Sequence, residues 1–415
     1  MSAWRFVPDP DTSTAIRMVP LPVVRSECRS LHRGSYRGGM IDRWVLDPQT
    51  THLNHGSFGA TPRAVLDTQR RLQDRFEANP TGFIEDHYQE ELARARARLA
   101  AFVGTDPASL AFVTNATTGV ASVVGSLELA PGDEILTTDH AYNACRNIID
   151  VRAAQAGATV SIAPIDFPDA SPDQAAEAVL SRVTGRTRLV VVDHVTSPTG
   201  LVLPVERILA QLEPQVPVLI DGAHAPGMLA LTLGEFGSSY YTGNLHKWVC
   251  APKGAGLLYV AERHRDSIRP PVISHGWNTP RQGASLFHRL FDWAGTFDPS
   301  AWLAVPAALD EMASMEPDGW PGVMRANREL ALAARDLLCE RLSIDRPAPD
   351  EMIGSMAAVP LSAATPGLAR RLREQAIVAT IPEWPRPGAF VLRVSAQRYN
   401  AIDDYARLAD ALAAD

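Results

Sequence analysis

Only two lysines occur among the 415 residues, Lys247 and Lys253, so chemistry that needs a primary amine has two candidates. Lys247 lies in Asn244-Leu245-His246-Lys247-Trp248. A lysine amine forms a Schiff base with an aldehyde when its surroundings lower its pKa. Lys253 lies between Pro252 and Gly254, a setting typical of a turn. Lys247 is therefore the predicted nucleophile, and the alternative is an ordinary surface lysine.

A carboxylate follows a short apolar run at residues 216–220, in Asp221-Gly222-Ala223-His224. An ionised carboxylate at the end of a buried strand needs a partner, because a lone buried charge is heavily penalised. A cationic ring nitrogen would be such a partner. The alternative is that Asp221 caps the following helix.

A third segment, Thr114-Asn115-Ala116-Thr117-Thr118-Gly119, follows a predicted strand at residues 110–113 and begins a helix. Helix N-terminal amides and threonine hydroxyls together can bind a phosphate, and a simple helix cap is the alternative. A phosphate cradle, a partner for a pyridinium nitrogen and a Schiff-base lysine are what a protein supplies to pyridoxal 5'-phosphate. The three segments together therefore predict that cofactor.

With these segments in this order, the sequence resembles the fold-type-I pyridoxal-phosphate enzymes, in particular class V aminotransferases of the isopenicillin N epimerase and cysteine desulfurase branch. The resemblance covers roughly residues 50–405. Besides the segments above, it rests on Leu53-Asn54-His55-Gly56-Ser57-Phe58-Gly59, Asp139-His140-Ala141-Tyr142, His194-Val195-Thr196-Ser197-Pro198-Thr199-Gly200 and Ala294-Gly295-Thr296.

The resemblance implies a role for each matching residue. Lys247 would bond to the cofactor and move protons, Asp221 would keep the pyridine nitrogen protonated, and His224 would reach the phenolic oxygen. The ring would stack on His140 or Tyr142, between which the sequence does not decide. Further cofactor contacts would come from Asn115, Ala116, Thr117, His246, Thr196 and Thr296.

Two of these implied contacts carry a qualification. Where desulfurases place an asparagine beside the ring oxygen, this chain has Thr196-Ser197-Pro198, which leaves that contact open. Thr296 would reach the phosphate of a neighbouring subunit, which implies a homodimer with shared active sites.

For the substrate, the resemblance implies that Arg393 binds an α-carboxylate, a geometry that suits a guanidinium group. The alternative for Arg393 is a surface arginine on an edge strand. Asn54 and His55 are further candidates for substrate binding, and no metal is expected.

All reactions implied by the resemblance act at Cα or Cβ of an amino acid through a quinonoid intermediate. We favour β-elimination, the C–S lyase reaction, on a cysteine conjugate in secondary metabolism. Epimerisation, decarboxylation-coupled oxidative deamination and transamination are the alternatives. Desulfuration through a persulfide is disfavoured, because the only cysteine well beyond the lysine is Cys339, on a predicted amphipathic helix where a buried thiol is expected. Cys145, close to Tyr142, is a candidate to lie near the substrate.

The elements that position these residues alternate between strand and helix. Apolar runs at residues 110–113, 134–137, 159–162, 189–192, 216–220 and 255–260 alternate with helical patterns such as 171–184 and 204–213. This pattern predicts an α/β fold with a mainly parallel sheet, of the seven-stranded type in the family it resembles. Ligands of such sheets lie beyond the carboxyl ends of the strands, where the segments above begin.

The expected domains are an N-terminal arm or extension (1–50), a large cofactor-binding domain (51–298) and a smaller C-terminal α+β domain (299–415). The last contains predicted helices at 301–316, 320–342 and 401–413 and a strand at 390–395. Met40 is an alternative start, so the sequence leaves open whether residues 1–39 belong to the native protein.

Composition excludes several other classes. Hydrophobic residues make up 46% and charged residues 21%, as in ordinary globular proteins. The net charge of −8 and the lack of a polybasic tract disfavour nucleic acid as a partner. No apolar run approaches a membrane span, and four widely spaced cysteines favour a reducing cytoplasm.

Two other functional classes fit the motifs less well. A dehydrogenase is disfavoured because no Gly-x-Gly-x-x-Gly follows a strand. An effector-sensing module that keeps the cofactor fold is disfavoured because the first 45 residues show no helix-turn-helix pattern.

Overall fold

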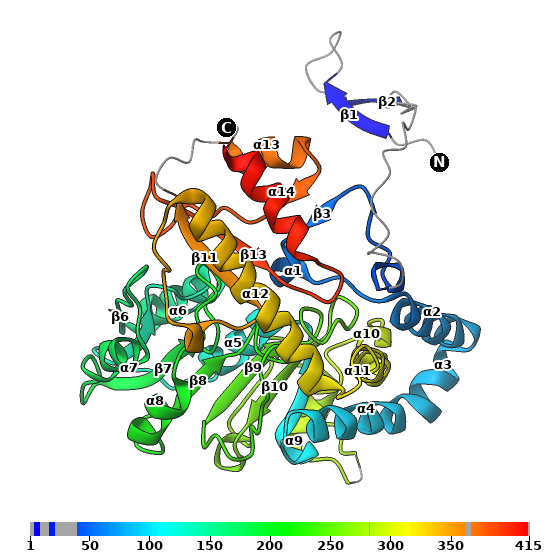
Figure 1. The fold of residues 1–415 in the computed structure, drawn as a ribbon. Coiled ribbons are helices and arrows are strands. Elements are labelled where there is room, and N and C mark those ends of the chain that lie inside the picture. The colour runs from blue at the N-terminus through cyan, green and yellow to red at the C-terminus, as the bar shows by residue number, and fades with distance from the viewer. Residues whose placement is uncertain (1–3, 9–15, 21–39, 282, 362–366, 414–415) are drawn as a thin grey trace. The chain divides into compact units, whose positions relative to one another are not determined.

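The computed structural model describes residues 4–8, 16–20, 40–281, 283–361 and 367–413 (Figure 1). The chain divides into two compact units, Met1–Gly38 and Gly39–Asp415. In the first unit, β1 (Trp4–Pro8) and β2 (Ile16–Pro20) pair in antiparallel fashion. The sequence predicted a loose arm here and did not predict these strands. Each is only five residues long and ends in proline, which gives a weak strand signal.

The second unit begins at Gly39, whereas the sequence analysis placed the end of the N-terminal arm at residue 50. A short 3-10 helix covers Ile41–Arg43, and the following Trp44 is only 1% exposed. The Trp44 ring packs edge-on against Tyr399, with centroids 5.2 Å apart. This burial ties residues 41–50 to the second unit, whereas the division expected between residues 298 and 299 stays a prediction.

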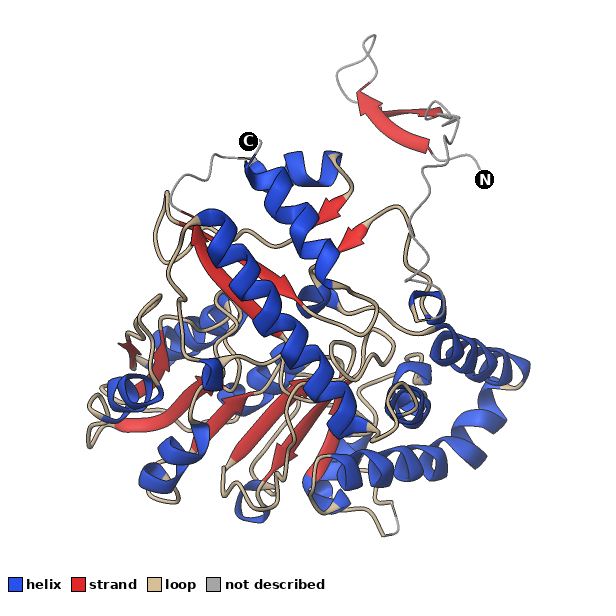
Figure 2. Ribbon diagram, viewed as in Figure 1, coloured by secondary structure: helices blue, strands red, loops and turns tan. Residues whose placement is uncertain are grey.

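A seven-stranded sheet with the order β4-β10-β9-β8-β7-β5-β6 forms the centre of the second unit (Figure 2). Only β10 runs antiparallel to its neighbours, and the remaining neighbouring pairs are parallel. The strands are β4 (Leu110–Val113), β5 (Glu134–Thr138), β6 (Thr159–Ala163), β7 (Thr187–Asp193), β8 (Val218–Asp221), β9 (Tyr240–Asn244) and β10 (Gly256–Val260). The predicted α/β class with a mainly parallel sheet is confirmed.

Helices cover both faces of this sheet, which explains why its strands are continuous apolar runs. On β7, Val190 and Val192 join one hydrophobic cluster, and Leu189 and Val191 join the cluster on the other face. The helices of the sheet region are α5 (Ala116–Gly125), α6 (Asn143–Ala156), α7 (Pro172–Leu180), α8 (Val205–Leu212) and α9 (Leu286–Phe291).

The helices before the sheet are α1 (His55–Phe58), α2 (Arg63–Ala78), α3 (Pro80–Gly82) and α4 (Tyr88–Phe102). After it, the helix expected at 301–316 is two helices, α10 (Ser300–Leu303) and α11 (Val305–Ala313), and Pro306 lies in the first turn of the second. Proline has no N–H to bond to the preceding turn, so it favours a new helix start at this point.

The C-terminal part contains α12 (Trp320–Leu342), α13 (Leu368–Glu374) and α14 (Ile402–Ala413). There, β11 (Met356–Leu361) pairs in antiparallel fashion with β13 (Phe390–Ser395), and α12 packs on α14 and β11. A short parallel pair, β12 (Ile377–Val378) with β3 (Thr51–His52), joins the C-terminal part to the segment before α1. Residues near 55 are thereby brought to residues near 395.

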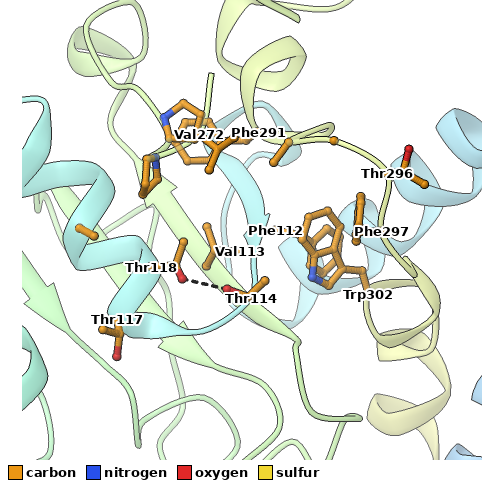
Figure 3. A pocket seen from close by; sticks show the side chains of 15 residues that line it. Phe112, Val113, Thr114, Thr117, Thr118, Val272, Phe291, Thr296, Phe297 and Trp302 are labelled. Carbon is orange, nitrogen blue, oxygen red and sulfur yellow. Dashed lines mark hydrogen bonds between the residues drawn. The ribbon is translucent and has the colours of Figure 1, made fainter. Parts of the chain in front are cut away.

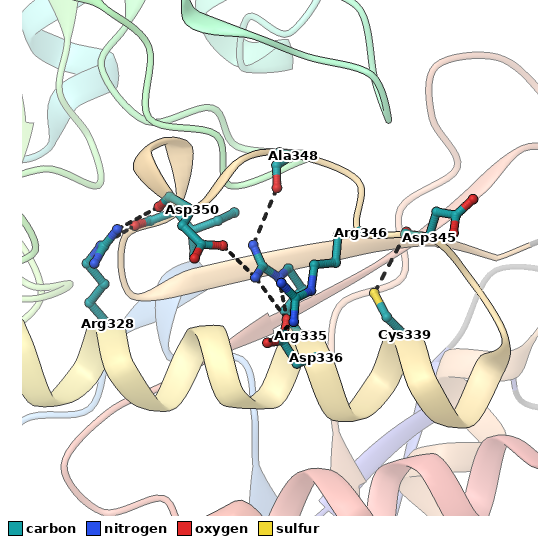
Figure 4. A network of polar contacts seen from close by, with 9 residues as sticks. Arg328, Arg335, Asp336, Cys339, Asp345, Arg346, Ala348 and Asp350 are labelled. Carbon is teal, nitrogen blue, oxygen red and sulfur yellow. Dashed lines mark hydrogen bonds and ion pairs between the residues drawn. The ribbon is translucent and has the colours of Figure 1, made fainter.

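An ion-pair network links α12 to the segment that follows it (Figure 4). Arg335, 1% exposed, donates to Asp336 Oδ1 at 2.8 Å, Asp350 Oδ1 at 2.6 Å and the carbonyl of Ala348 at 3.3 Å. Arg346 adds a bond of 2.8 Å to Asp336 Oδ2. All these groups belong to the scaffold and lie outside the pockets described below.

Candidate active site

The carboxyl ends of three neighbouring strands converge on one pocket. Asp193 ends β7, Asp221 ends β8 and Asn244 ends β9, and Asp193 is the register partner of Asp221. The pocket has a volume of about 210 Å³. Its lining comprises Ser57, Phe58, Asn115, Ala116, Thr117, Tyr142, Asp193, Ser197, Asp221, Ala223, His224, Asn244, His246 and Lys247. The structure thus brings the three predicted segments together at the strand ends.

Lys247 enters this pocket from the loop after β9 and is 9% exposed. Its Nζ lies 3.1 Å from His224 Nε2. Burial and the nearby charge of Arg393 lower the pKa of Lys247 to about 7, although Asp221 acts in the opposite direction. At neutral pH a large share of this amine is therefore neutral and nucleophilic.

The Asp221 carboxylate is fixed by two donors, the backbone N–H of Ala223 at 3.0 Å and the Cys145 thiol at 3.2 Å. Burial raises the pKa of Asp221, and the two hydrogen bonds and Lys247 oppose that shift. The neighbouring Asp193 is also buried, and burial and the charge of Asp221 raise its pKa. A buried carboxylate pair of this kind is stabilised by a cation, as the expected pyridinium nitrogen would be.

The start of α5 provides fewer free donors than the sequence suggested. The Ala116 N–H donates to Asn244 Oδ1 at 2.8 Å, and Asn115 Oδ1 accepts from the Thr118 N–H at 2.9 Å. Asn115 therefore caps the helix, and its Oδ1 and the Ala116 amide are bonded within the protein. Both residues line the pocket, and their expected cofactor contacts stay predictions. The Thr117 amide lies in the first helical turn, where no intrahelical acceptor exists. Thr117 is thus the member of this segment that best fits a phosphate.

His246 lines the same end of the pocket. Its Nδ1 lies 3.2 Å from the carbonyl of Ala255, so Nδ1 carries the proton that bonds there. Burial lowers the pKa of His246 to about 4. Its Nε2 would therefore donate to a phosphate only after a second proton binds, which the negative charge of a phosphate favours.

The structure separates the two candidates for ring stacking. Tyr142 is 47% exposed and lines the pocket. His140 is fully buried outside the lining, where its Nδ1 lies 3.0 Å from Asp139 Oδ1 and its ring packs on Trp384 with centroids 4.4 Å apart. Tyr142 therefore lines the pocket and His140 does not, and which of the two stacks on the cofactor ring stays a prediction.

Thr196 is likewise directed away from the pocket. It is fully buried, its hydroxyl lies 2.7 Å from Thr199 Oγ1, and the Leu201 N–H donates to it at 2.9 Å. This turn is satisfied internally, so the expected cofactor contact of Thr196 is corrected. Its neighbour Ser197 lines the pocket instead.

Arg393 lies beside this turn and is 4% exposed, which excludes the surface arginine considered above. Its guanidinium donates to the Ser197 carbonyl, to Ser57 Oγ at 2.8 Å and to Asn54 Oδ1 at 3.3 Å. Its Nε has no hydrogen-bond partner among the described residues. Arg393 thus fits a substrate carboxylate, and Asn54 acts on it indirectly by orienting the guanidinium.

His55 lies behind Lys247 and does not line the pocket. Its Nε2 is 3.0 Å from the backbone carbonyl of Lys247, and its Nδ1 is 3.0 Å from the Tyr399 hydroxyl. Burial lowers the pKa of His55 to about 3, so the ring is neutral; Nε2–H donates to the carbonyl and Nδ1 accepts from Tyr399. The expected substrate contact is therefore corrected to support of the lysine backbone.

Gly59, in the same motif as His55, cannot be replaced by a larger residue for steric reasons. Gly59 has φ +69°, and a Cβ at this position would lie 1.9 Å from the carbonyl oxygen of His246. Only glycine lets the segment after α1 approach the lysine loop so closely.

Thr296 lies outside the lysine pocket. It lines an adjacent apolar cavity of about 480 Å³, together with Thr117, Val272, Phe291, Phe297 and Trp302 (Figure 3). In this cavity the hydroxyls of Thr114 and Thr118 lie 2.8 Å apart at the start of α5. The expected role of Thr296 toward a neighbouring subunit stays a prediction.

Several pocket residues were absent from the sequence predictions. Asp193, like Asp221, is an acidic residue at the end of an apolar strand, so the same argument could have predicted it. Asn244 opens the recognised lysine motif, but its strand was not predicted because Gly243 and Asn244 disfavour strands. Ser57 and Ser197 lay inside recognised motifs, but their side-chain directions depend on the turns.

The pocket fits pyridoxal phosphate by its own chemistry. It combines a buried amine with a pKa near neutrality, a fixed carboxylate in need of a cation, and His224, whose Nδ1 has no partner among the described residues. A helix start with a free amide and hydroxyl is the fourth element. The described residues contain no cluster of three or more His, Cys, Asp or Glu side chains that could hold a metal, and none of their helices is long and apolar enough to cross a membrane.

Curated proteins of two kinds are similar to the chain. It is 36% identical to isopenicillin N epimerase of Amycolatopsis lactamdurans, over 88% of this chain and 95% of that one. It is 31% identical to putative L-cysteine desulfhydrase 1 of Oryza sativa subsp. japonica, over 87% and 82% of the two chains.

Among solved structures, the cystine C-S lyase C-DES, in complex with its product cysteine persulfide, has a TM-score of 0.76 and 24% identity. The match covers 88% of this chain and 98% of that one and shows the fold. The aminotransferase class-V profile matches residues 57–377. With the pocket geometry, these similarities establish that the chain belongs to the class-V aminotransferase family and is a pyridoxal-phosphate-dependent enzyme.

Proposed function

We propose that this enzyme is a C–S lyase that cleaves a cysteine conjugate by β-elimination. The observation that carries this proposal is a buried lysine of lowered pKa near a buried arginine, with no accessible thiol among the described residues. Of the four cysteines, Cys145, Cys250 and Cys339 lie among the described residues, and all three are buried. Burial, above all, raises their pKa values, so none is suited to accept sulfur as a persulfide.

The cofactor supplies an aldehyde that captures the substrate amine and a protonated ring that withdraws electrons from Cα. Arg393 would bind the α-carboxylate and thereby fix the orientation of Cα relative to Lys247. Lys247, as a neutral amine, takes the Cα proton, and His224, 3.1 Å from it, orients its Nζ. Asp221 keeps the ring protonated, held in place by Cys145 and Ala223.

The elimination breaks the Cβ–S bond, and the electron pair leaves with sulfur, which takes up a proton to become a thiol. The three-carbon fragment then reacts with water and gives pyruvate and ammonium. Each conjugate therefore consumes one water and yields one thiol, one pyruvate and one ammonium. Relatives named L-cysteine desulfhydrase support this reaction class.

Epimerisation is the second candidate. Relatives named isopenicillin N epimerase have the higher identities, and Tyr142 offers a hydroxyl group on the pocket wall. An epimerase needs a proton donor on the face of Cα opposite the lysine, and Tyr142 fits that requirement. Decarboxylation-coupled deamination and transamination share the same opening steps but gain no specific support.

We also propose a homodimer with shared sites. The apolar cavity around Thr296 lies next to the large exposed side chains of Val272 and Ile273, which are 54% and 51% exposed. Exposed apolar surface of this kind is typical of a protein interface. Size-exclusion chromatography with light scattering gives the molar mass of the wild type and of Val272→Asp, and a dimer in the wild type that becomes a monomer in the variant would support this assembly.

A reducing compartment such as the cytoplasm is supported by the unpaired state of the three described cysteines. A role in secondary metabolism is supported by the epimerase relatives alone.

The test is an absorbance spectrum of the purified enzyme with added pyridoxal phosphate, followed by product assays with a panel of L-cysteine conjugates. We expect a band near about 410 to 430 nm that is lost in Lys247→Ala. Release of pyruvate, ammonia and thiol would support the lyase. Carbon dioxide release, or inverted substrate without fragments, would instead assign the decarboxylating or epimerising reaction.

A further inference from the structure

A second cavity of about 600 Å³ adjoins the lysine pocket. The two share Ser57, Tyr142 and Ser197 as walls, so one opens toward the other. Arg393 lines the second cavity, whereas Lys247 lines only the first. The remaining lining is Thr138, Asp139, Ala141, Asn143, Arg146, Pro198, Thr380, Pro382, Glu383 and Trp384.

Two fixed points determine where a substrate side chain must lie. The α-amino group is directed to Lys247 in the first pocket, and the α-carboxylate is bound by Arg393 at the junction. The first pocket, about 210 Å³, is occupied by the cofactor when it is bound. The Cβ substituent therefore extends into the second cavity, which is almost three times larger.

The chemistry of this cavity favours a negatively charged end group. Arg146 lies on the first turn of α6, and its Nε bonds to Asp150 Oδ1 at 2.8 Å, so its two terminal nitrogens remain for a ligand. The N-cap residue of α6, Tyr142, makes no capping hydrogen bond with its side chain, so its side chain does not occupy the amides of the first turn.

The two acids of the lining already have donors. Asp139 accepts from the Ile165 N–H at 3.0 Å and lies 3.0 Å from His140 Nδ1, and Glu383 accepts from the Gly388 N–H at 2.5 Å. These bonds partly stabilise both carboxylates. Among the described residues of the lining, the Thr138 hydroxyl and Arg393 Nε also lack a partner, and Arg146 adds a cation whose bond to Asp150 uses only its Nε. The aromatic rings of Tyr142 and Trp384 flank the path toward it.

We propose that the second cavity binds the sulfur substituent of the substrate and that this substituent carries a carboxylate recognised by Arg146. The natural substrate would then be an S-conjugate of cysteine with a carboxylate-bearing group, rather than free cysteine, whose leaving sulfur would leave the cavity empty. This inference rests on the proposed lyase function.

The test compares three substrates with the holoenzyme: S-(2-carboxyethyl)-L-cysteine, S-propyl-L-cysteine and L-cysteine. The first two differ mainly in the carboxylate. A charge-assisted hydrogen bond in a partly enclosed cavity is expected to lower KM by about tenfold for the carboxylate conjugate. In Arg146→Gln this advantage disappears, so the KM values of the two conjugates become equal.

The control variant is Arg94→Gln, which removes one exposed positive charge on α4 far from either pocket. It should keep the preference of the wild type. Equal KM values for the two conjugates would overturn the role of Arg146. A free cysteine that reacts as efficiently as both conjugates would overturn the assignment of the cavity.

A binding measurement separates this inference from the proposed function. Calorimetry with Lys247→Ala holoenzyme yields dissociation constants without turnover. If no conjugate gives pyruvate but the carboxylate conjugate still binds about tenfold more tightly than S-propyl-cysteine, the lyase proposal fails and the cavity assignment stands. If neither preference nor turnover is seen, both fail.

Discussion

Two regions of this enzyme bury charged side chains, and they do so in opposite ways. In the network at α12, the guanidinium of Arg335 meets two carboxylates and a carbonyl. Burial disfavours its charge, but the hydrogen bonds and charges of Asp350 and Asp336 outweigh burial and raise the pKa of Arg335. Here every charge has its partner in the chain.

In the lysine pocket the balance is reversed. Burial shifts the pKa values of Lys247, Asp221 and Arg393 against their charged forms, and here the neighbouring groups do not outweigh burial. For Arg393 the pKa falls to about 10. The scaffold satisfies its charges, whereas the pocket leaves them to be satisfied by cofactor and substrate. Buried groups whose pKa values are shifted against their charged forms mark the functional site more clearly than buried charge itself.

The largest effect should come from replacing the central amine. Lys247→Ala should lower pyruvate release by about a thousandfold or more, because nucleophile and proton carrier are lost together. The free energy of unfolding should stay equal or rise, since a poorly stabilised buried amine is removed. Product assays and thermal unfolding measure the two quantities, and Lys253→Met is the matched lysine control. A large loss of stability would contradict the contrast drawn above.

In the scaffold network the effect should fall on stability instead. Arg335→Ala should destabilise the fold by about 2 kcal/mol, through lost hydrogen bonds to carboxylates that remain partly in water. Arg335→Met, which keeps most of the volume, should lose less. Urea unfolding measures both, with kcat expected to be unchanged. A variant that unfolds normally but loses activity would place this network in the catalytic machinery.

The support behind the lysine should show a smaller, kinetic effect. His55→Ala removes the donor to the Lys247 carbonyl, so kcat should fall by roughly tenfold while KM changes little. Tyr399→Phe removes only the hydroxyl that orients the ring and should have the weaker effect. His55→Asn, which retains an N–H donor, should recover part of the loss. A change confined to KM would point back to direct substrate contact.

The smallest expected effect is on the pKa of Lys247. Because the pKa of Lys247 is lowered to about 7, the neutral amine predominates above that pH. The rate at which cofactor-free enzyme takes up pyridoxal phosphate should therefore rise with pH up to about 7 and then level off. Arg393→Gln removes a charge that lowers this pKa, so the midpoint should move upward. Absorbance-monitored uptake across pH values measures it, and an unchanged midpoint would remove Arg393 as a cause.

The fold and the cofactor were largely predictable from the sequence because both depend on local signals. Apolar runs bounded by turns gave six of the seven sheet strands, the motifs after two of them gave Asp221 and Thr117, and the scarcity of lysine gave Lys247. The strand Tyr240–Asn244 escaped because its polar and glycine residues do not form an apolar run, although all five are buried. The loss of that strand also concealed Asn244.

Three residues with implied roles at the site lie outside the pocket lining, and one cause explains all three. His140, Thr196 and His55 belong to correctly recognised motifs, but their side chains lie behind the pocket wall, where they bond to the protein itself. A motif gives the order of residues along the chain. In a turn, however, the side chains of successive residues point in very different directions. The spacing of residues therefore did not determine whether His140 or Tyr142 faces the cavity. The same holds for Thr196 and Ser197.

The sequence by itself determined the α/β architecture, the chemistry of the amine and the cofactor it serves, because residue type and periodicity carry that information. Only the tertiary structure decided which side chains face the pocket, and that Arg393 stands between a cofactor-sized pocket and a larger cavity. Those features depend on contacts between segments hundreds of residues apart, such as Asn54 with Arg393 and His55 with Lys247. Their geometry is set when the segments pack together.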